Sequence, residues 1–113
     1  MKTQRQIRKY PNRRLYDTYE SRYITLADIR GFVVNGIDFM VVEKGSQKDI
    51  TDRILLQVIS EQEESGERIL GRDFLLQTIR LYGSPLQGTI GEHLRKSVSS
   101  CVSQVSASPI RQE

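Results

Sequence analysis

Two short segments of apolar, aromatic and basic residues flank a turn in residues 6–17, which are Gln6-Ile7-Arg8-Lys9-Tyr10-Pro11-Asn12-Arg13-Arg14-Leu15-Tyr16-Asp17. Proline restricts φ to about −65° and asparagine tolerates left-handed backbone geometry, so Pro11-Asn12 predicts a turn. Residues 6–10 and 14–17 are therefore expected to pair as an antiparallel hairpin. A second turn over residues 18–21 then predicts a third strand at residues 22–24.

A short helix is predicted over residues 26–34. Thr25 is a suitable N-cap, and Asp28 stands three residues later, where its carboxylate can accept from the N–H of the cap. Apolar residues then recur at helical spacing until Asn35-Gly36, where glycine can take the left-handed conformation that ends a helix. The continuous apolar run at residues 39–42 predicts a buried strand.

The rest of the chain is predicted to be helical. Thr51 is the N-cap candidate of a helix that ends at Gly66, and residues 73–82 form the next helix, which ends at Gly83. From Ile90 onward an apolar stripe follows helical spacing, but six serines between Ser97 and Ser108 weaken its helicity. We expect the end of the chain to fray or to order only on a partner. The predicted class is α+β, with a small N-terminal antiparallel hairpin or sheet, then helices, and an amphipathic C-terminal helix.

Length and composition exclude several classes of protein. With 113 residues the chain has the size of one domain, and its apolar runs are too short to span a membrane. Polar residues begin at Lys2, so no secretory signal is expected and the predicted location is cytoplasmic. His93 and Cys101 are the only residues of their types, and no glycine-rich phosphate loop is present. We therefore expect no catalytic residues, no metal site and no cofactor.

Positive charge is concentrated at the N-terminus. Residues 1–22 contain seven lysines and arginines against two carboxylates, although the net charge of the whole chain is only +3. Four of the five tyrosines lie at positions 10, 16, 19 and 23. A basic segment rich in tyrosine beside a mildly acidic remainder is typical of a surface that binds anions.

A basic hairpin has a physical route to DNA binding. Arginine offers a planar fork that suits phosphates and guanine edges, tyrosine can contact sugars, phosphates or bases, and a two-stranded ribbon fits the major groove. Composition alone leaves RNA binding or a merely solvated face open. For Tyr16 and Tyr23 core packing is as plausible as ligand contact, and Asn12 can either contact an adenine or satisfy the turn.

The segments 8–18 and 21–29 together carry a long and unusual pattern that resembles the N-terminal domain of the polyhydroxyalkanoate synthesis repressor family. The resemblance continues through Gly36-Ile37-Asp38-Phe39 and Asp49-Ile50-Thr51 to residue 64, and Ile79-Arg80-Leu81-Tyr82-Gly83 resembles the family's second region. It implies a DNA-binding domain at residues 1–66, a helical part of a granule-associated region at 67–83, and a Ser-rich amphipathic tail at 84–113.

That resemblance implies a bacterial transcriptional repressor that binds double-stranded DNA near granule-protein genes and leaves DNA when it adsorbs to granules of polyhydroxyalkanoate (PHA), of which polyhydroxybutyrate (PHB) is one. The family's basic positions match Arg8, Lys9, Arg13 and Arg14. Including flanking residues, the predicted DNA-binding set is Arg5, Arg8, Lys9, Tyr10, Asn12, Arg13, Arg14 and Tyr16. A homo-oligomer is expected, and its assembly or granule surface is predicted at Phe74, Ile79, Leu94, Val98 and Val105. The alternative is an interaction module whose basic face binds an acidic protein or granule surface without nucleic-acid specificity.

Overall fold

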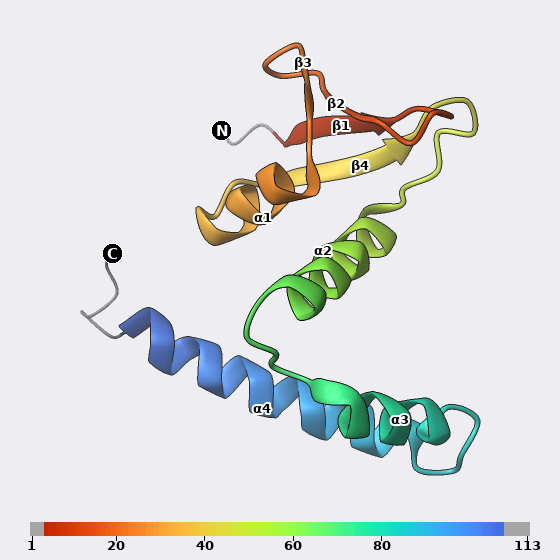
Figure 1. Cartoon of the computed structure of the whole chain (residues 1–113), viewed down its shortest axis with the longest axis vertical. Helices are drawn as coiled ribbons and strands as arrows, with labels where there is room; N and C mark the ends of the chain where they lie inside the picture. The colour runs from red at the N-terminus through yellow and green to blue at the C-terminus, as the bar shows by residue number, and fades with distance from the viewer. Residues whose placement is uncertain (1–3, 108–113) are drawn as a thin grey trace. The chain divides into compact units, whose positions relative to one another are not determined.

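The computed structural model describes residues 4–107, with side chains for residues 4–104, and the chain divides into two compact units, Met1–Ile69 and Leu70–Glu113 (Figure 1). The arrangement is α+β, as predicted: a four-stranded sheet and two helices form the first unit, and two helices form the second. The predicted fraying at the extreme C-terminus concerns residues that lie outside the described part of the chain.

The sheet has the strand order β3-β2-β1-β4. Strands β1 (Arg5–Lys9), β2 (Leu15–Asp17) and β3 (Arg22–Ile24) form the predicted antiparallel meander, with Arg8 opposite Tyr16 and Tyr16 opposite Tyr23. Strand β4 (Phe39–Glu43) is the predicted apolar strand, and it pairs with β1 in parallel, with Ile7 beside Val41. The sequence did not predict this parallel pairing, which makes the sheet mixed and β1 an inner strand.

Helix α1 (Leu26–Val34) has the predicted boundaries and both predicted ends. The Thr25 hydroxyl accepts from the N–H of Asp28, and an Asp28 carboxylate oxygen accepts from the N–H of Thr25 at 2.9 Å, which completes a capping box. Gly36 follows the last turn with a φ of +71°, a conformation that costs glycine little. These local signals fix where the chain enters and leaves the helix between β3 and β4.

The core lies between the sheet and the two helices α1 and α2 (Thr51–Ser65), which lie on the same side of the sheet (Figure 1). Ile7 on β1 and Val41 on β4 are completely buried, as are Ile29 on α1 and Ile54 on α2. Burying each such side chain stabilises the fold by about 1.5–3 kcal/mol. The helices therefore cover one face of the sheet.

The start of α2 differs from the prediction that Thr51 is its N-cap. Thr51 is the first helical residue, and the cap residue is Ile50, which makes no side-chain cap hydrogen bond. The Thr51 hydroxyl instead accepts from the buried N–H of Val41 at 2.9 Å and donates to Asp49 Oδ1 at 2.6 Å. Thr51 therefore closes the outer edge of β4, because that backbone donor would otherwise lack a partner.

The second unit contains α3 (Gly71–Leu81) and α4 (Gln87–Ala107). Both helices begin earlier than predicted, at residue 71 rather than 73 and at residue 87 rather than 90, and α3 ends just before Gly83, whose φ is +84°. No residue of this unit is buried among those whose side chains are described. None of the helices in residues 4–107 is long and apolar enough to cross a membrane.

Replacing Thr51 by valine should lower the free energy of unfolding by about 1–3 kcal/mol, because it leaves the buried N–H of Val41 without its acceptor. Thr51→Ser keeps the hydroxyl and should cost much less. Urea unfolding of both variants measures the difference. Equal stability of Thr51→Val and the parent chain would contradict the proposed closure of the β4 edge.

The same contact should make stability depend on pH. Hydrogen bonds from the Thr51 hydroxyl and N–H lower the pKa of the Asp49 carboxyl. Because this pKa is lower in the folded chain than in the unfolded one, the contribution is complete above the unfolded pKa and is lost as the pH falls through the folded pKa. In Asp49→Asn, urea titrations across acidic pH should show a smaller loss of stability than in the parent chain.

Candidate nucleic-acid interface

The pleat of the sheet separates the core from a polar and aromatic face. Side chains alternate along a strand, so Ile7 faces the helices while its neighbour Arg8 faces away from them. Residues that pair directly across neighbouring strands form one row over all four strands, which consists of Tyr23, Tyr16, Arg8 and Val42. Val42 is buried but is not part of the helix-covered core cluster. We call the side of the sheet opposite the helices the outer face.

Three tyrosines form a cluster on the outer face. The ring centroids of Tyr16 and Tyr23 are 5.2 Å apart with an edge-to-face angle of 76°. Tyr10 lies 6.1 Å from Tyr16 and 6.3 Å from Tyr23. Edge-to-face pairs of this kind stabilise by about 0.5–1.5 kcal/mol beyond their buried area. Ring contacts thus hold Tyr10, Tyr16 and Tyr23 together, away from the core that the helices cover.

Two cations lie over this tyrosine cluster. The guanidinium carbon of Arg14 is 3.9 Å from the centroid of the Tyr23 ring, and the ammonium of Lys44 is 5.4 Å from that of Tyr10. The negative face of an aromatic ring attracts a cation by about 0.5–1 kcal/mol at an exposed site. The rings therefore hold positive charge at defined positions.

The turn between β1 and β2 has the geometry of a three-residue hairpin loop. The N–H of Arg13 donates to the carbonyl of Tyr10 at 2.8 Å, and Arg13 has a φ of +70°. A left-handed residue is usual at this place in such loops, but it is generally glycine. The Asn12 side chain accepts from the N–H of Arg14 at 3.0 Å, so its carboxamide oxygen satisfies the turn. Arginine at position 13 is held in a backbone conformation that costs about 1–2 kcal/mol.

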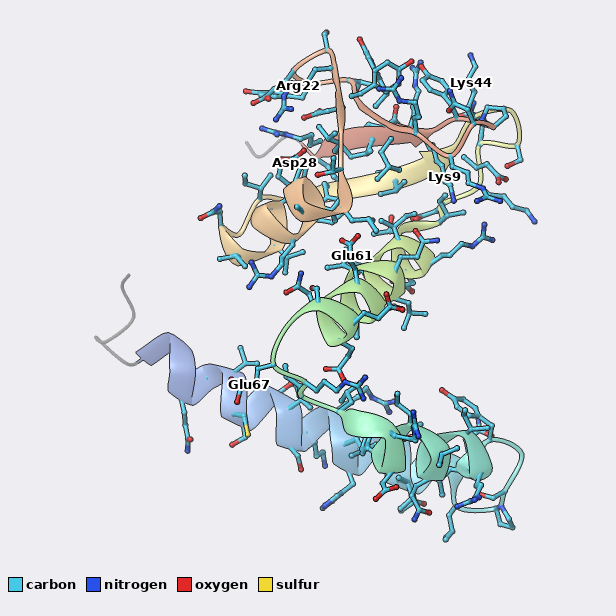
Figure 2. All side chains as sticks on the ribbon, viewed as in Figure 1. Lys9, Arg22, Asp28, Lys44, Glu61 and Glu67 are labelled. Carbon is cyan, nitrogen blue, oxygen red and sulfur yellow. The ribbon has the colours of Figure 1, made fainter. Side chains whose placement is uncertain are left out.

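Lys9 and Lys44 lie at the end of the sheet that carries this turn, whereas Arg22 lies at the opposite end (Figure 2). The N–H of Lys44 donates to the carbonyl of Lys9 at 2.9 Å, which joins the turn after β4 to the end of β1. A hollow of about 280 Å³ lies between the two turns and is lined by Lys9, Tyr10, Pro11, Arg13, Glu43 and Lys44. Four of the basic side chains, Lys9, Arg13, Arg14 and Lys44, thus gather at one end of the sheet, which we call the cationic end.

Arg5 has a different environment from the other predicted basic residues. Its guanidinium is 3.2 Å from the carboxylate of Asp17, and the two side chains are 14% and 0% exposed. It also lies 4.4 Å from the centroid of the Tyr19 ring and 4.8 Å from that of Phe32. Removing one partner of a buried ion pair costs about 3–5 kcal/mol. Arg5 therefore has a structural role on the helix-covered side of the sheet.

The structure brings most of the predicted DNA-binding residues together. Arg8, Tyr10, Arg14 and Tyr16 share the outer face, and Lys9 and Arg13 lie at the cationic end, while Arg5 and Asn12 make internal contacts. The predicted set omitted Tyr23 and Lys44. Neighbouring residues of a strand point to opposite faces, so the core position of Ile24 could have placed Tyr23 on the outer face from the sequence. The position of Lys44 depends on the parallel pairing of β4 with β1, which no local signal indicates.

The residues predicted for assembly or granule binding lie in the second unit. Phe74, Ile79 and Val98 are exposed and Leu94 is half-buried. Val105 belongs to α4, but its side chain lies outside the described part. Large apolar side chains at the surface of α3 and α4 also include Leu75, Leu76 and Val102.

Comparison with known proteins assigns the chain to a family. Residues 6–66 match the PHB/PHA accumulation regulator DNA-binding domain. An uncharacterized protein of Allochromatium vinosum is 49% identical over 87% of this chain, which spans 64% of that relative's length. An uncharacterized protein in the phbA 5'region of Thiocystis violacea is also 49% identical over 87% of this chain, which spans 71% of that protein. No solved structure matches the chain.

The matched residues contain all of the sheet except Arg5, together with the whole of α1 and α2, and with them the tyrosine cluster and the cationic end. This type of domain is a regulator's DNA-binding domain and not a type of enzyme. The chain belongs to the family of PHB/PHA accumulation regulators and carries their DNA-binding domain at residues 6–66.

Proposed function

We propose that this protein is a sequence-specific repressor that binds double-stranded DNA at genes for polyhydroxyalkanoate synthesis or granule proteins. The main support is the gathering of Lys9, Arg13, Arg14 and Lys44 at one end of the sheet within a DNA-binding domain. The name of the Thiocystis violacea relative, which places it in the phbA 5'region, supports the link to these genes.

In this mechanism the β1–β2 hairpin enters the major groove with its turn first. A two-stranded ribbon is narrow enough for a groove about 12 Å wide. Arg8, Lys9 and Lys44 contact phosphates, which supply most of the affinity, and the arginines of the turn approach the base edges. The helices on the opposite side of the sheet stay outside the groove.

The second unit serves assembly in this proposal. One hairpin contacts too few bases for genomic specificity, so a dimer on a repeated or palindromic site is the simplest active form. Exposed Phe74, Ile79 and Val98 on α3 and α4 offer apolar area for a second copy. The same apolar side chains can adsorb to a polyester granule, which would compete with assembly and release DNA. The regulator would then move between nucleoid and granule in the bacterial cytoplasm.

Fluorescence anisotropy of the full chain tests the proposal. The labelled probe is a duplex from upstream of a granule-protein gene, and a scrambled duplex of equal length competes at a stated salt concentration. A regulator should prefer the first duplex by roughly a thousandfold or more. Equal, weak binding to both duplexes would contradict it and would favour the alternative, a basic face that binds an acidic protein or granule surface.

Arg13→Gly should separate stability from binding. Glycine removes the left-handed strain but adds backbone entropy to the unfolded chain, so the free energy of unfolding should change by less than about 1 kcal/mol. Loss of the basic side chain should weaken DNA binding by about 1–3 kcal/mol. Anisotropy and urea unfolding measure the two effects.

The matched control for Arg13→Gly is Ser21→Gly, because Ser21 also has a positive φ, of +56°, in the turn between β2 and β3. It carries no charge and lies outside the cationic end, so its replacement should leave DNA affinity unchanged. Full affinity in folded Arg13→Gly would remove Arg13 from the interface.

Granule binding should depend on the second unit. Val98→Asp places a charge on the exposed apolar surface of α4, and it should reduce adsorption to PHB particles at least several-fold. Leu56→Asp is the control, since Leu56 in the first unit is 66% exposed and Val98 is 58% exposed. A sedimentation assay with purified particles measures both, and equal adsorption of the two variants would exclude α4 as the granule surface.

A further inference from the structure

We propose that Arg14 is the specificity-determining residue of this interface, that it recognises a guanine in the major groove, and that Tyr23 is its positioning residue. This inference rests on the proposed function and deepens it, because it assigns base recognition to one of the basic side chains at the cationic end. These basic side chains differ in how firmly each is held before DNA binds.

The backbone of Arg14 is fixed on both sides. Its N–H donates to Asn12 Oδ1 at 3.0 Å, and its carbonyl accepts from the N–H of Tyr10 at 3.0 Å. The first bond ties Arg14 to the turn, and the second ties it to the end of β1. The direction in which its side chain leaves the backbone is therefore set by the hairpin.

The guanidinium of Arg14 is held as well. Its carbon lies 3.9 Å from the centroid of Tyr23, and Tyr23 is supported by Tyr16 at 5.2 Å and Tyr10 at 6.3 Å. When a guanidinium stacks on a ring, the ring occupies its face, and its N–H groups, which lie in the guanidinium plane, remain available to a ligand. Guanine presents two acceptors, O6 and N7, at a spacing that matches this fork.

The other cations are less suited to this task. The ammonium of Lys44 is a compact point charge, which recognises a phosphate without regard to direction. In the part of the chain that the structure describes, the guanidinium of Arg13 makes no hydrogen bond, ion pair or ring contact. Its side chain must therefore be ordered on binding, an entropic cost that Arg14 has largely avoided.

Arg14→Lys is the sharpest test, because it keeps the charge but loses both the fork and the planar stack. The full chain is used to select duplexes from a pool with a randomised central segment at fixed salt. The parent chain should enrich a motif that contains guanine. Arg14→Lys should lose preference at one guanine position by about fivefold to more than a hundredfold, with binding to random duplex nearly unchanged.

Variants of Tyr23 test positioning. Tyr23→Leu removes the ring under Arg14 and should weaken preference at the same guanine, whereas Tyr23→Phe keeps the ring and should restore it. Tyr23 is 44% exposed, so neither change empties the core. Arg22→Lys is the matched control, because Arg22 lies at the opposite end of the sheet from the turn (Figure 2), and it should select the same motif as the parent chain.

The outcomes separate this inference from the proposed function. If Arg14→Lys selects the parent motif with equal preference, the inference is wrong and the proposed function stands. A uniform loss of binding to every duplex in folded Arg14→Lys would assign Arg14 to phosphates and would also overturn the inference. If the parent chain enriches no motif, the proposed function fails, and the inference fails with it.

Discussion

The alternation of side chains along β1 determines how the sheet, the helices and the basic face are arranged. Because successive residues point to opposite faces, Ile7 enters the core while Arg8 faces away from the helices. A shift of register by one residue would bury Arg8 and expose Ile7, so the hydrophobic core and the outer face fix each other. Strand β1 is paired on both sides, with β2 and β4, and this alternation therefore sets the faces of the whole sheet.

Charged side chains serve two different purposes in the first unit. On the helix-covered side Asp17 is completely buried, and Arg5 and the N–H of Tyr19 satisfy its carboxylate at 3.2 Å and 2.9 Å. On the outer face and at the cationic end, Arg14 and Lys44 lie over tyrosine rings and keep their charge open to a ligand. The first arrangement neutralises a charge to hold the strands together, and the second leaves the charge exposed, as the proposed contact with DNA requires. Both occur within one small sheet because the pleat keeps them on different sides.

The energetics of the two units also differ. The first unit has a cluster of completely buried side chains from the sheet, α1 and α2, whereas the described side chains of α3 and α4 are at most half-buried. Two helices without a buried core gain little from tertiary packing, which supplies most of the stability of helices in proteins. This difference supports the proposal that apolar side chains of α3 and α4 are completed by another surface, either a second copy or a granule.

Local residue patterns were enough to predict most of the helices and strands and the family. Pro11-Asn12, the Thr25–Asp28 capping box and Gly36 act within a few residues, so the hairpin and α1 could be predicted closely, and most of the basic residues of the site with them. The long-range packing of the fold, by contrast, sets the parallel pairing of β4 with β1, the contact of Thr51 with the edge of β4 and the ion pair of Arg5 with Asp17. It also brought Tyr23 and Lys44 to the site. These contacts join residues that are not neighbours in the sequence. Their energies depend on which polar groups the fold buries away from water, and no local pattern specifies this.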